Sequence, residues 1–432
     1  MKCTVLLIAF IFSYAHALER PSLQAIIDST PKDATVVLKA GTYQGPVIVN
    51  KAITIDGRNE VIFDGGGKGS VITILADGVV VKNLKVINSG DSHDKMDAGI
   101  LVRSSNNKFH NNIISNTLFG FNLAKSHNNE LIGNDISSKK VDLGMRGDGI
   151  KVWASNNNLF SKNIIHDSRD MVIWYSDGNK VLDNKGWNNR YSLHFMYSGA
   201  NTVLRNKYRN SAVGIFLMYS HDTVIENNQI SFSTGGTGMG IGMKEVDNLT
   251  IRFNSIVYNT TGIYLDQSPH KPSAHNIIFG NTIAHNKDGV VLHGTLINNV
   301  FKGNAFLDNI EDVYVHSNGT ASENIWSGNY WADYEGFDRN SDGYGDYKFT
   351  KKKYFAQQWI EHPNGKFFYG SPILSVLNFL SRLAPLSEPI FVLEDKKPIF
   401  FKNSKLRLSS NNMVFDRSEL IFDEDLEDDE DY

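Results

Sequence analysis

Cysteine is almost absent from this 432-residue chain, in which Cys3 is the only one. It lies within residues 1–17, where Lys2, an apolar stretch and the triplet Ala15-His16-Ala17 have the pattern of a secretory signal peptide with its cleavage site. Cleavage there would start the mature chain at Leu18. The mature protein can then have no disulfide bond, no cysteine nucleophile and no cysteine metal ligand. Any site for a soft metal must use histidine or methionine.

Long hydrophobic runs and basic clusters are also missing. After residue 17 no run approaches the roughly 18 apolar residues of a membrane span, so we expect an exported, soluble product. The formal net charge is −4, but residues 416–432 hold ten acidic residues and one arginine, which gives this segment a charge of −9. The rest of the chain has no basic stripe of the kind that binds nucleic acid. A tail this acidic is typical of a disordered segment.

What the chain does contain is a repeat of aliphatic strand, serine corner and asparagine. The repeat is clearest in four segments that recur at intervals of 21, 22 and 22 residues: GIKVWAS at 149–155, DMVIWYS at 170–176, SLHFMYS at 192–198 and GIFLMYS at 214–220. A period between roughly 20 and 50 residues is the signature of a solenoid. We therefore predict an all-β solenoid of about 22-residue coils, opened by a short capping helix at residues 22–29.

A second short apolar run in each coil ends in asparagine. Stacked coils would lay these side chains on one another, so each amide could donate a hydrogen bond to the next along the axis. We interpret them as structural, because such a ladder satisfies polar groups that are buried between coils. The predicted ladder contains Asn112, Asn134, Asn163, Asn184, Asn206, Asn227, Asn254, Asn281 and Asn304.

Alternation along each strand predicts which side chains fill the coil and which face solvent. The predicted inward set is Phe121, Leu123, Ile150, Val152, Met171, Ile173, Leu193, Phe195, Ile215, Leu217, Ile263 and Leu265. One predicted outward column is Trp153, Trp174, Met196, Met218, Lys244, Asp266 and His293. Its neighbouring column is Lys151, Val172, His194, Phe216, Gly242, Tyr264 and Val291.

The first four members of the first column, Trp153, Trp174, Met196 and Met218, should form one exposed stripe, because stacked strands lie only about 4.8 Å apart. We call these four residues the aromatic-methionine stripe. A soluble protein rarely leaves such a patch without a use. Either a loop or the C-terminal segment covers it, or it serves partner docking, ligand stacking or metal transfer.

Within this face, His194 and Met196 lie two residues apart on one strand, so imidazole and thioether emerge on the same side. Met218 should lie one coil away. Imidazole and thioether together suit Cu(I), whereas hard cations prefer oxygen. We therefore predict a copper contact at His194, Met196 and Met218.

Residues 338–346, DRNSDGYGD, match the start of a calcium-binding loop. Oxygen ligands would come from Asp338, Asn340, Asp342 and Asp346, but Phe349 stands where such a loop has its bidentate glutamate. Two interpretations remain open, a structural Ca²⁺ and an Asp-rich turn without metal. Neither is catalytic.

Residues 372–383 combine an early proline with leucines at helical spacing, which predicts a short helix that presents Leu374, Leu377 and Leu380. A helix of about 12 residues cannot span a bilayer. It packs on the end of the solenoid as a cap, docks on a membrane partner, or does both.

A second functional hypothesis is a secreted polysaccharide lyase or epimerase, or a carbohydrate-binding protein, on the same fold. Its acid-base group would be His166, Asp167, Arg169 and Asp170, with Trp153 and Trp174 as platforms for sugar rings. The fold cannot exclude it. Single Asp or His residues at solenoid corners are more often turn formers, and the stripe changes from tryptophan to methionine and histidine where a sugar site needs carboxylates and amides.

The chain closely resembles the NosD family, periplasmic maturation proteins of nitrous oxide reductase. The resemblance spans most of residues 35–395 and excludes the acidic tail. The segments that carry it are GDGIKVW at 147–153, SLHFMYS at 192–198, GIFLMYS at 214–220, NIWSGNYWADYEGFDRNSDGYGD at 324–346 and LSRLAPLSEPIFVLED at 380–395.

This resemblance implies a right-handed parallel β-helix in the periplasm, without enzymatic activity, bound to an ABC transporter made of a membrane subunit and an ATPase. Such proteins work with a copper chaperone to supply the copper-sulfur centre of nitrous oxide reductase. The family pattern covers His194, Met196, Tyr197, Met218 and Tyr219, without settling which of them touches copper.

These lines together predict the organisation of the chain. We expect a signal peptide at 1–17, a β-helix at 18–323, a cap and transporter-docking segment at 324–395, and a tail at 396–432 that is acidic from about residue 416. Partner docking is predicted on the β-helix face and on the short helix. The docking residues are Trp153, Trp174, Tyr197, Phe216, Tyr219, Leu374, Leu377 and Leu380.

Overall fold

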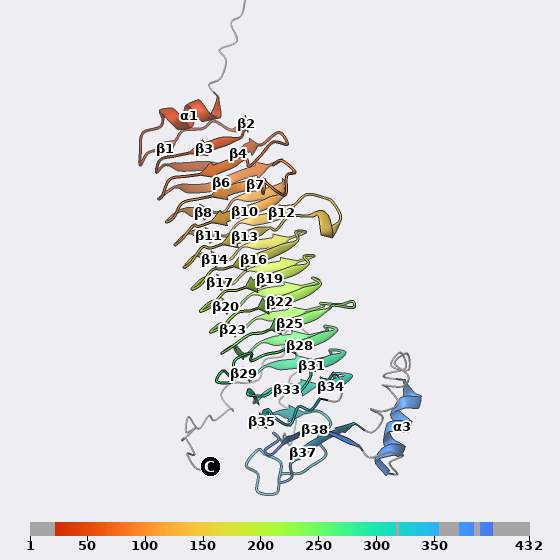
Figure 1. Ribbon diagram of the computed structural model, residues 1–432. Coiled ribbons are helices and arrows are strands. Elements are labelled where there is room, and N and C mark those ends of the chain that lie inside the picture. Colours follow the sequence, from red (N-terminus) through yellow and green to blue (C-terminus); the bar gives the residue numbers. More distant parts are fainter. Residues whose placement is uncertain (1–21, 317–318, 354–370, 384–388, 401–432) are drawn as a thin grey trace, which may run out of the picture.

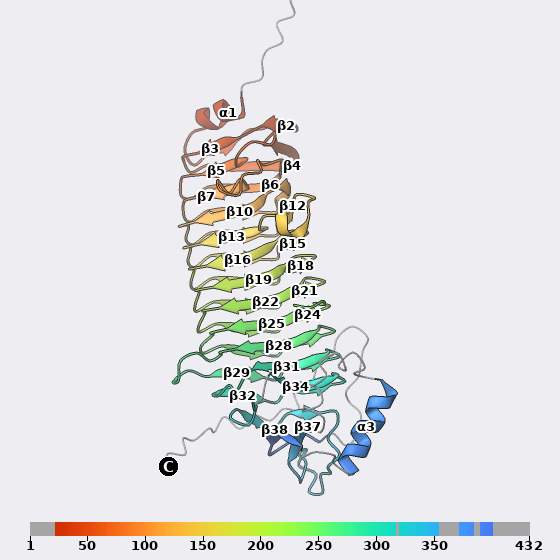
Figure 2. The same ribbon diagram turned by 45° about the vertical axis from the view of Figure 1, so that its right-hand side comes forward.

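The computed structural model describes residues 22–316, 319–353, 371–383 and 389–400. The chain is a right-handed parallel β-helix, in which successive coils stack along one axis (Figures 1 and 2). This confirms the predicted fold. The predicted signal peptide and the acidic tail lie outside the described residues.

One side of the solenoid is a 12-stranded parallel sheet to which each coil adds one strand. Its strands are β3 (Val47–Val49), β5 (Ile72–Ile74), β7 (Ala98–Val102), β10 (Phe119–Ala124), β13 (Ile150–Trp153), β16 (Asp170–Trp174), β19 (Tyr191–Met196), β22 (Val213–Met218), β25 (Met239–Lys244), β28 (Thr261–Asp266), β31 (Asp288–His293) and β34 (Glu311–Val315).

The remaining sides belong to a 24-stranded sheet with two rows of short strands. Its first strands are β1 (Thr35–Val36), β2 (Gly41–Gln44), β4 (Thr54–Asp64) and β6 (Val80–Ile87). One row then runs through β8 (Lys108–His110), β11 (Glu130–Ile132), β14 (Leu159–Ser161), β17 (Lys180–Leu182), β20 (Thr202–Leu204), β23 (Val224–Glu226), β26 (Thr250–Arg252), β29 (Asn276–Phe279), β32 (Asn299–Lys302) and β35 (Ile325–Ser327). The other runs through β9 (Ile113–Thr117), β12 (Asp135–Ser138), β15 (Ile164–His166), β18 (Lys185–Trp187), β21 (Lys207–Arg209), β24 (Gln229–Ser231), β27 (Ser255–Val257), β30 (Thr282–Ala284), β33 (Ala305–Leu307) and β36 (Tyr330–Trp331).

The interior is filled by alternate residues of these strands. All twelve residues predicted to point inward are fully buried, because the two-residue period of a strand sends every second side chain into the coil. Coils lengthen to 29, 26 and 27 residues where they contain insertions, at residues 137–147, 233–238 and 268–274. The first of these insertions contains the 3₁₀ helix η1 (Leu143–Met145).

The asparagine ladder is present and fully buried. Each side-chain amide donates to the next asparagine and to a strand carbonyl, as when Asn184 Nδ2 donates to Asn206 Oδ1 and to the Phe160 carbonyl, both at 2.9 Å. One predicted member was wrong. Asn228 occupies the rung between Asn206 and Asn254, whereas Asn227 has a left-handed backbone with φ 57° and donates to Glu226.

The ladder has a parallel companion that was not predicted from the sequence. At another corner of the coil, Asn107, Asn129, Asn158 and Asn179 are joined in the same way, with side-chain N···O distances of 2.9 to 3.1 Å between the first three pairs. These residues recur at the same intervals as the first ladder. The register of the repeats would have revealed them.

A short helix covers the first coil. Helix α1 (Leu23–Ser29) begins after Ser22, whose side chain accepts a hydrogen bond from the Ala25 backbone N–H and so caps the helix. Leu23 and Ile27 are buried against the first coil, while Ile26 is only partly buried. The helix therefore protects the open end of the core.

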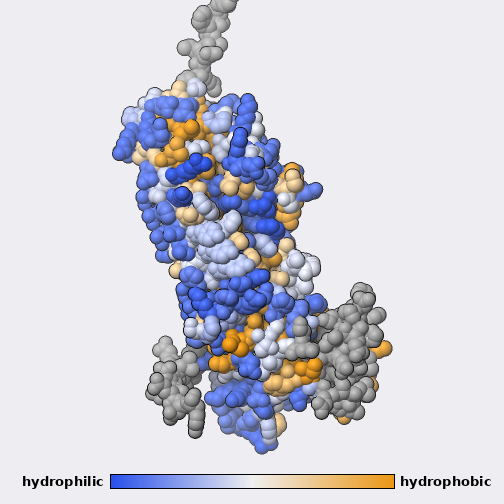
Figure 3. All heavy atoms as spheres, in the orientation of Figure 1, coloured by the Kyte–Doolittle hydropathy of each residue, from blue (hydrophilic) through white to orange (hydrophobic). Residues whose placement is uncertain are grey.

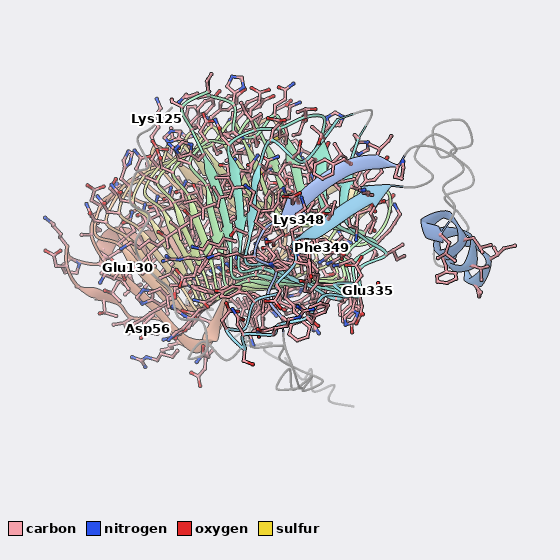
Figure 4. The ribbon with its side chains drawn as sticks, turned by 90° about the horizontal axis from the view of Figure 1, so that it is seen from below. Asp56, Lys125, Glu130, Glu335, Lys348 and Phe349 are labelled. Carbon is pink, nitrogen blue, oxygen red and sulfur yellow. The ribbon has the colours of Figure 1, made fainter. Side chains whose placement is uncertain are left out.

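The last coil is closed by an antiparallel hairpin made of β37 (Phe349–Lys353) and β38 (Ile390–Asp395). Phe349 of the hairpin stacks on Trp331 of the last coil at 4.6 Å, and Figure 4 shows it lying at this end of the solenoid. Asp395 is fully buried, and its carboxylate accepts hydrogen bonds from the backbone N–H and the side-chain amide of Asn329 at 2.9 and 3.0 Å. The asparagine ladder thus ends on a carboxylate.

Helix α3 (Pro372–Leu383) stands beside this end and apart from the stacked coils in all three ribbon views (Figures 1, 2 and 4). Its described apolar side chains, Ile373, Val376, Phe379, Leu380 and Leu383, are all at least half exposed. The hairpin, and not these side chains, covers the solenoid end. None of the described helices has the length and apolarity of a membrane span.

Candidate functional site

The outer surface of the 12-stranded sheet brings the predicted stripe residues into one column. Strand pairing aligns Trp153 with Trp174, Trp174 with Met196, and Met196 with Met218. The column continues through Lys244 and Asp266 to His293. Trp153 is 38% exposed and the next three side chains are partly buried. Two thioethers therefore lie on neighbouring strands, directly beside two indole rings.

Exposure alone does not single out this stripe. Figure 3 shows apolar residues at both ends of the solenoid and over the loop that contains η1. Exposed apolar side chains there include Val37, Ile48, Leu143, Met145 and Ile325. The stripe differs in its chemistry, because two indole rings are followed by two thioether sulfurs, with a histidine in the adjacent column.

Tyrosines extend this face around the corner of the coil. The rings of Tyr175 and Tyr197 stack at 5.0 Å, and those of Tyr197 and Tyr219 at 4.7 Å. All three have left-handed backbones, with φ between 49° and 52°, which is uncommon for a bulky residue. Tyr175 was not among the predicted docking residues, although the repeated tyrosine-serine pair in the three aligned coils marks it. The stack adds an exposed aromatic edge to the stripe.

The prediction that His194 faces solvent was wrong. Only 8% of the residue is exposed, because the Tyr191 ring lies edge-on to the imidazole at 4.9 Å and the Phe216 ring at 6.2 Å. Neither ring nitrogen of His194 has a hydrogen-bond partner. Its Nδ1 lies 3.9 Å from Asp170 Oδ2, which is an ion-pair distance but is too long for a hydrogen bond.

Asp170, which lies one coil from this histidine, is one of two neighbouring buried carboxylates. Asp148 accepts hydrogen bonds from Arg169 at 2.9 and 3.3 Å, and Asp170 is held by Arg190 through two such bonds. Burial raises the pKa of Asp148, and the nearby charge of Asp170 raises it further. Burial opposes ionisation of Asp170 too, but His194 and Arg190 together hold its pKa below the ordinary value. The arrangement keeps a carboxylate charged under the aromatic face.

The donor set at His194, Met196 and Met218 fits a soft monovalent cation. A buried imidazole nitrogen without a partner is costly and is relieved by a ligand. Nitrogen and thioether donors favour Cu(I). Within the described ranges no three His, Cys, Asp or Glu side chains gather closely enough to hold a metal ion, so a site built from those donors alone is not seen.

The predicted calcium ligands are engaged by their own loop. Asp338 accepts hydrogen bonds from the backbone N–H groups of Ser341 at 2.6 Å and Gly343 at 2.9 Å. Asp342 accepts from the Asn340 side chain, and Asp346 from the Arg339 backbone N–H. These contacts describe an Asp-rich turn held by hydrogen bonds within the loop. Calcium binding has no support in the structure.

The predicted acid-base group does not come together as one site. His166 lies on β15, where it contacts Asp135 at 3.1 Å and Asp167 at 2.6 Å and stacks on Trp187. The carboxylates of Asp135 and Asp167 raise the pKa of His166. Arg169 pairs instead with Asp148, and Asp170, the first residue of β16, pairs with Arg190. Each of the four residues is thus committed to a local contact.

The predicted docking leucines of α3 are described in part. The Leu380 side chain is 50% exposed, whereas the side chains of Leu374 and Leu377 lie outside the described residues.

Comparisons with known proteins agree with one another along the chain. The family model described as "NosD: Periplasmic copper-binding protein (NosD)" matches residues 132–336. A protein of Pseudomonas aeruginosa described as a probable ABC transporter binding protein NosD is 30% identical over 368 residues, which cover 81% of this chain and 84% of that protein. A protein of Stutzerimonas stutzeri with the same description is 27% identical over 377 residues, covering 81% and 83%.

Among solved structures, the A-module of the Azotobacter vinelandii mannuronan C-5 epimerase AlgE6 has a TM-score of 0.58. It is 14% identical, and the match covers 70% of this chain and 93% of that one. At this identity the likeness shows the fold alone.

Proposed function

The chain belongs to the NosD family, and from that premise we propose that it is a non-catalytic periplasmic accessory protein which works with an ABC transporter. Its role is to help a copper chaperone supply the copper-sulfur centre of nitrous oxide reductase. The relationship over 368 residues supports the transporter context, since both curated relatives are described as ABC transporter binding proteins.

One structural observation carries the copper part of this proposal. The imidazole of His194 is buried without a hydrogen-bond partner in the column next to Met196 and Met218. A residue kept in that state is unusual, because buried polar groups in native proteins nearly always have partners. Copper here is cargo, bound and passed on, and the stacked tyrosines and tryptophans beside it offer an aromatic surface to the protein that delivers or receives it.

An anaerobic Cu(I) titration against a competing chelator tests this assignment. Wild type is expected to compete for one Cu(I), and His194→Ala/Met196→Ala/Met218→Ala to lower the affinity by more than about a hundredfold, because loss of an outer-shell partner alone costs about 10- to 100-fold. The matched control is His221→Ala/Met145→Ala, which removes one exposed imidazole and one exposed thioether elsewhere. Equal Cu(I) binding by wild type and the triple variant would refute a copper site on this face.

We propose that helix α3 binds the membrane subunit of the transporter, which would hold the protein at the membrane. Five of its apolar side chains are at least half exposed, and burying them on a partner would be favourable at about 25 cal/mol per Å². We expect the binding surface of the membrane subunit to be an apolar groove that accepts an amphipathic helix.

Phe379→Glu/Leu380→Glu is expected to abolish co-purification with the transporter while leaving the melting temperature unchanged, because both side chains are exposed. A charge in an apolar interface loses its hydration without gaining a partner. Ile277→Glu, which puts the same charge on an exposed apolar position of β29, is the control. Retention of the transporter by the α3 variant would assign docking to another surface.

The alternative of a polysaccharide lyase or epimerase has less support. His166, Asp167, Arg169 and Asp170 are each held in ion pairs with neighbours; His166 ends β15, Asp170 begins β16, and the other two lie in the turn between these strands. A catalytic acid and a catalytic base must each reach its own proton-transfer position on one bound substrate.

A further inference from the structure

The cover over His194 is made of two aromatic side chains that differ in how firmly they are held. Tyr191 and Phe216 stack on each other at 5.8 Å, and each meets the imidazole edge-on. The backbone N–H of Tyr191 donates to Asp170, and the Arg190 guanidinium lies over its ring at 4.8 Å. Phe216 has no polar group by which to be anchored, and it is partly exposed.

The resting place of the Phe216 ring is supplied by a glycine. In register, Phe216 pairs with Gly242 of β25, and a Cβ added to Gly242 would overlap two carbon atoms of the ring. The same Cβ would lie 3.2 Å from the Met239 sulfur. Any side chain at this position would therefore push the ring out of its place. Glycine is otherwise unfavourable in the interior of a strand, so its presence here points to a close approach.

An imidazole nitrogen under this cover can meet a ligand from outside only when one ring moves. Side-chain rotation at a protein surface is fast and needs no change in the coil. The core is not involved, because Phe216 points outward while its neighbours Ile215 and Leu217 are buried. Movement of Phe216 would expose the imidazole on the side of Met218, the residue that pairs with Met196.

We propose that Phe216 is a gate over His194: rotation of its ring away from Gly242 opens the imidazole to a small soft cation, and its return closes the site. The cation's part in this inference rests on the copper function proposed above, while the gate itself rests on the packing of Tyr191, Phe216 and Gly242. In the open state the cation takes the lone pair of a neutral imidazole nitrogen, and no redox step is involved. The apparent Kd for the cation equals the intrinsic Kd divided by the fraction of molecules in which the gate is open, so a mostly closed gate weakens binding.

The gate is tested by the rate at which diethyl pyrocarbonate modifies His194, measured by peptide mass spectrometry and normalised to the exposed His221 in the same sample. Phe216→Ala removes the gate and Gly242→Ala displaces it, so both are expected to raise the rate roughly tenfold. Tyr264→Ala is the matched control, because it truncates an aromatic side chain of the same column, two coils from Phe216. The ring partner of Tyr264 is His293. Unchanged rates in both gate variants would overturn the proposal.

The association rate of Ag⁺, a redox-stable probe for Cu(I), measured in chloride-free buffer, separates the two proposals. Faster Ag⁺ binding in Phe216→Ala and Gly242→Ala, abolished by adding His194→Ala, is the result expected if both hold. Faster modification of His194 without any Ag⁺ binding would leave the gate standing and refute the copper site. Ag⁺ binding at one common rate, with unchanged modification, would refute the gate alone.

Discussion

Asp395→Ala is expected to destabilise the C-terminal coils by about 3 to 5 kcal/mol, because it leaves several buried donors without an acceptor. The carboxylate accepts from the backbone N–H groups of Gly328, Asn329 and Lys397, and from the side chains of Asn329 and Trp331, at 2.9 to 3.1 Å. All its partners are donors. A carboxylate, which only accepts, is the group that the end of an asparagine ladder requires.

Two measurements test this prediction: hydrogen exchange of the backbone amides of residues 325–331, and denaturant unfolding. Hydrogen exchange is included because destabilising one end of a solenoid first increases local opening of the coils there. Asp395→Asn should fall between wild type and Asp395→Ala, because its one oxygen can serve only part of the donor set. The control is Glu394→Ala on the same strand, which loses only a partly exposed ion pair with Lys348, worth about 1 kcal/mol or less. If Asp395→Ala were as stable as Glu394→Ala, the capping role of Asp395 would be contradicted.

Asn184→Ala is expected to cost a similar amount, about 3 to 5 kcal/mol, from the middle of the ladder. Asn184 accepts from the backbone N–H and the side-chain amide of Asn163 at 2.9 and 3.0 Å, and donates to the Phe160 carbonyl. Alanine leaves these groups buried and unpaired, with a cavity beside them. Thermal or denaturant unfolding would report the loss.

Asn227→Gly is the matched control for this change. Asn227 precedes the true rung Asn228 and has the left-handed backbone that glycine adopts readily, so its loss should cost less than about 1 kcal/mol. If Asn227→Gly were as damaging as Asn184→Ala, the ladder assignment at this coil would be wrong.

The asparagine ladder and the capped ends explain how the solenoid is held together without a disulfide bond. The backbone N–H and the side-chain amide of each rung both donate to the next asparagine oxygen, and the N-terminal and C-terminal ends are closed by α1 and by the hairpin of β37 and β38. Stability is then shared between neighbouring coils. Side chains on the outer face of the 12-stranded sheet are therefore not needed to hold the coils together, and this face can carry residues that bind a ligand or a partner.

The sequence alone determined the features that depend on spacing. The fold, the inward side chains and the column of Trp153, Trp174, Met196 and Met218 all follow from two periods, two residues along a strand and about 22 from coil to coil. The same arithmetic could have found Tyr175 and the second asparagine ladder. It misplaced Asn227 by one residue, because neighbouring asparagines satisfy the same pattern and only the backbone conformation separates them.

Only the tertiary structure decided the features that depend on contacts between particular side chains. Burial of His194 results from Tyr191 three residues earlier and Phe216 one coil later, and the space for that ring comes from Gly242. Asp395 closes a ladder whose last rung is 66 residues earlier in the chain. Repeat spacing specifies the position of a Cβ atom, but burial and ion pairing depend on rotamers and on contacts between distant segments, which no local pattern encodes.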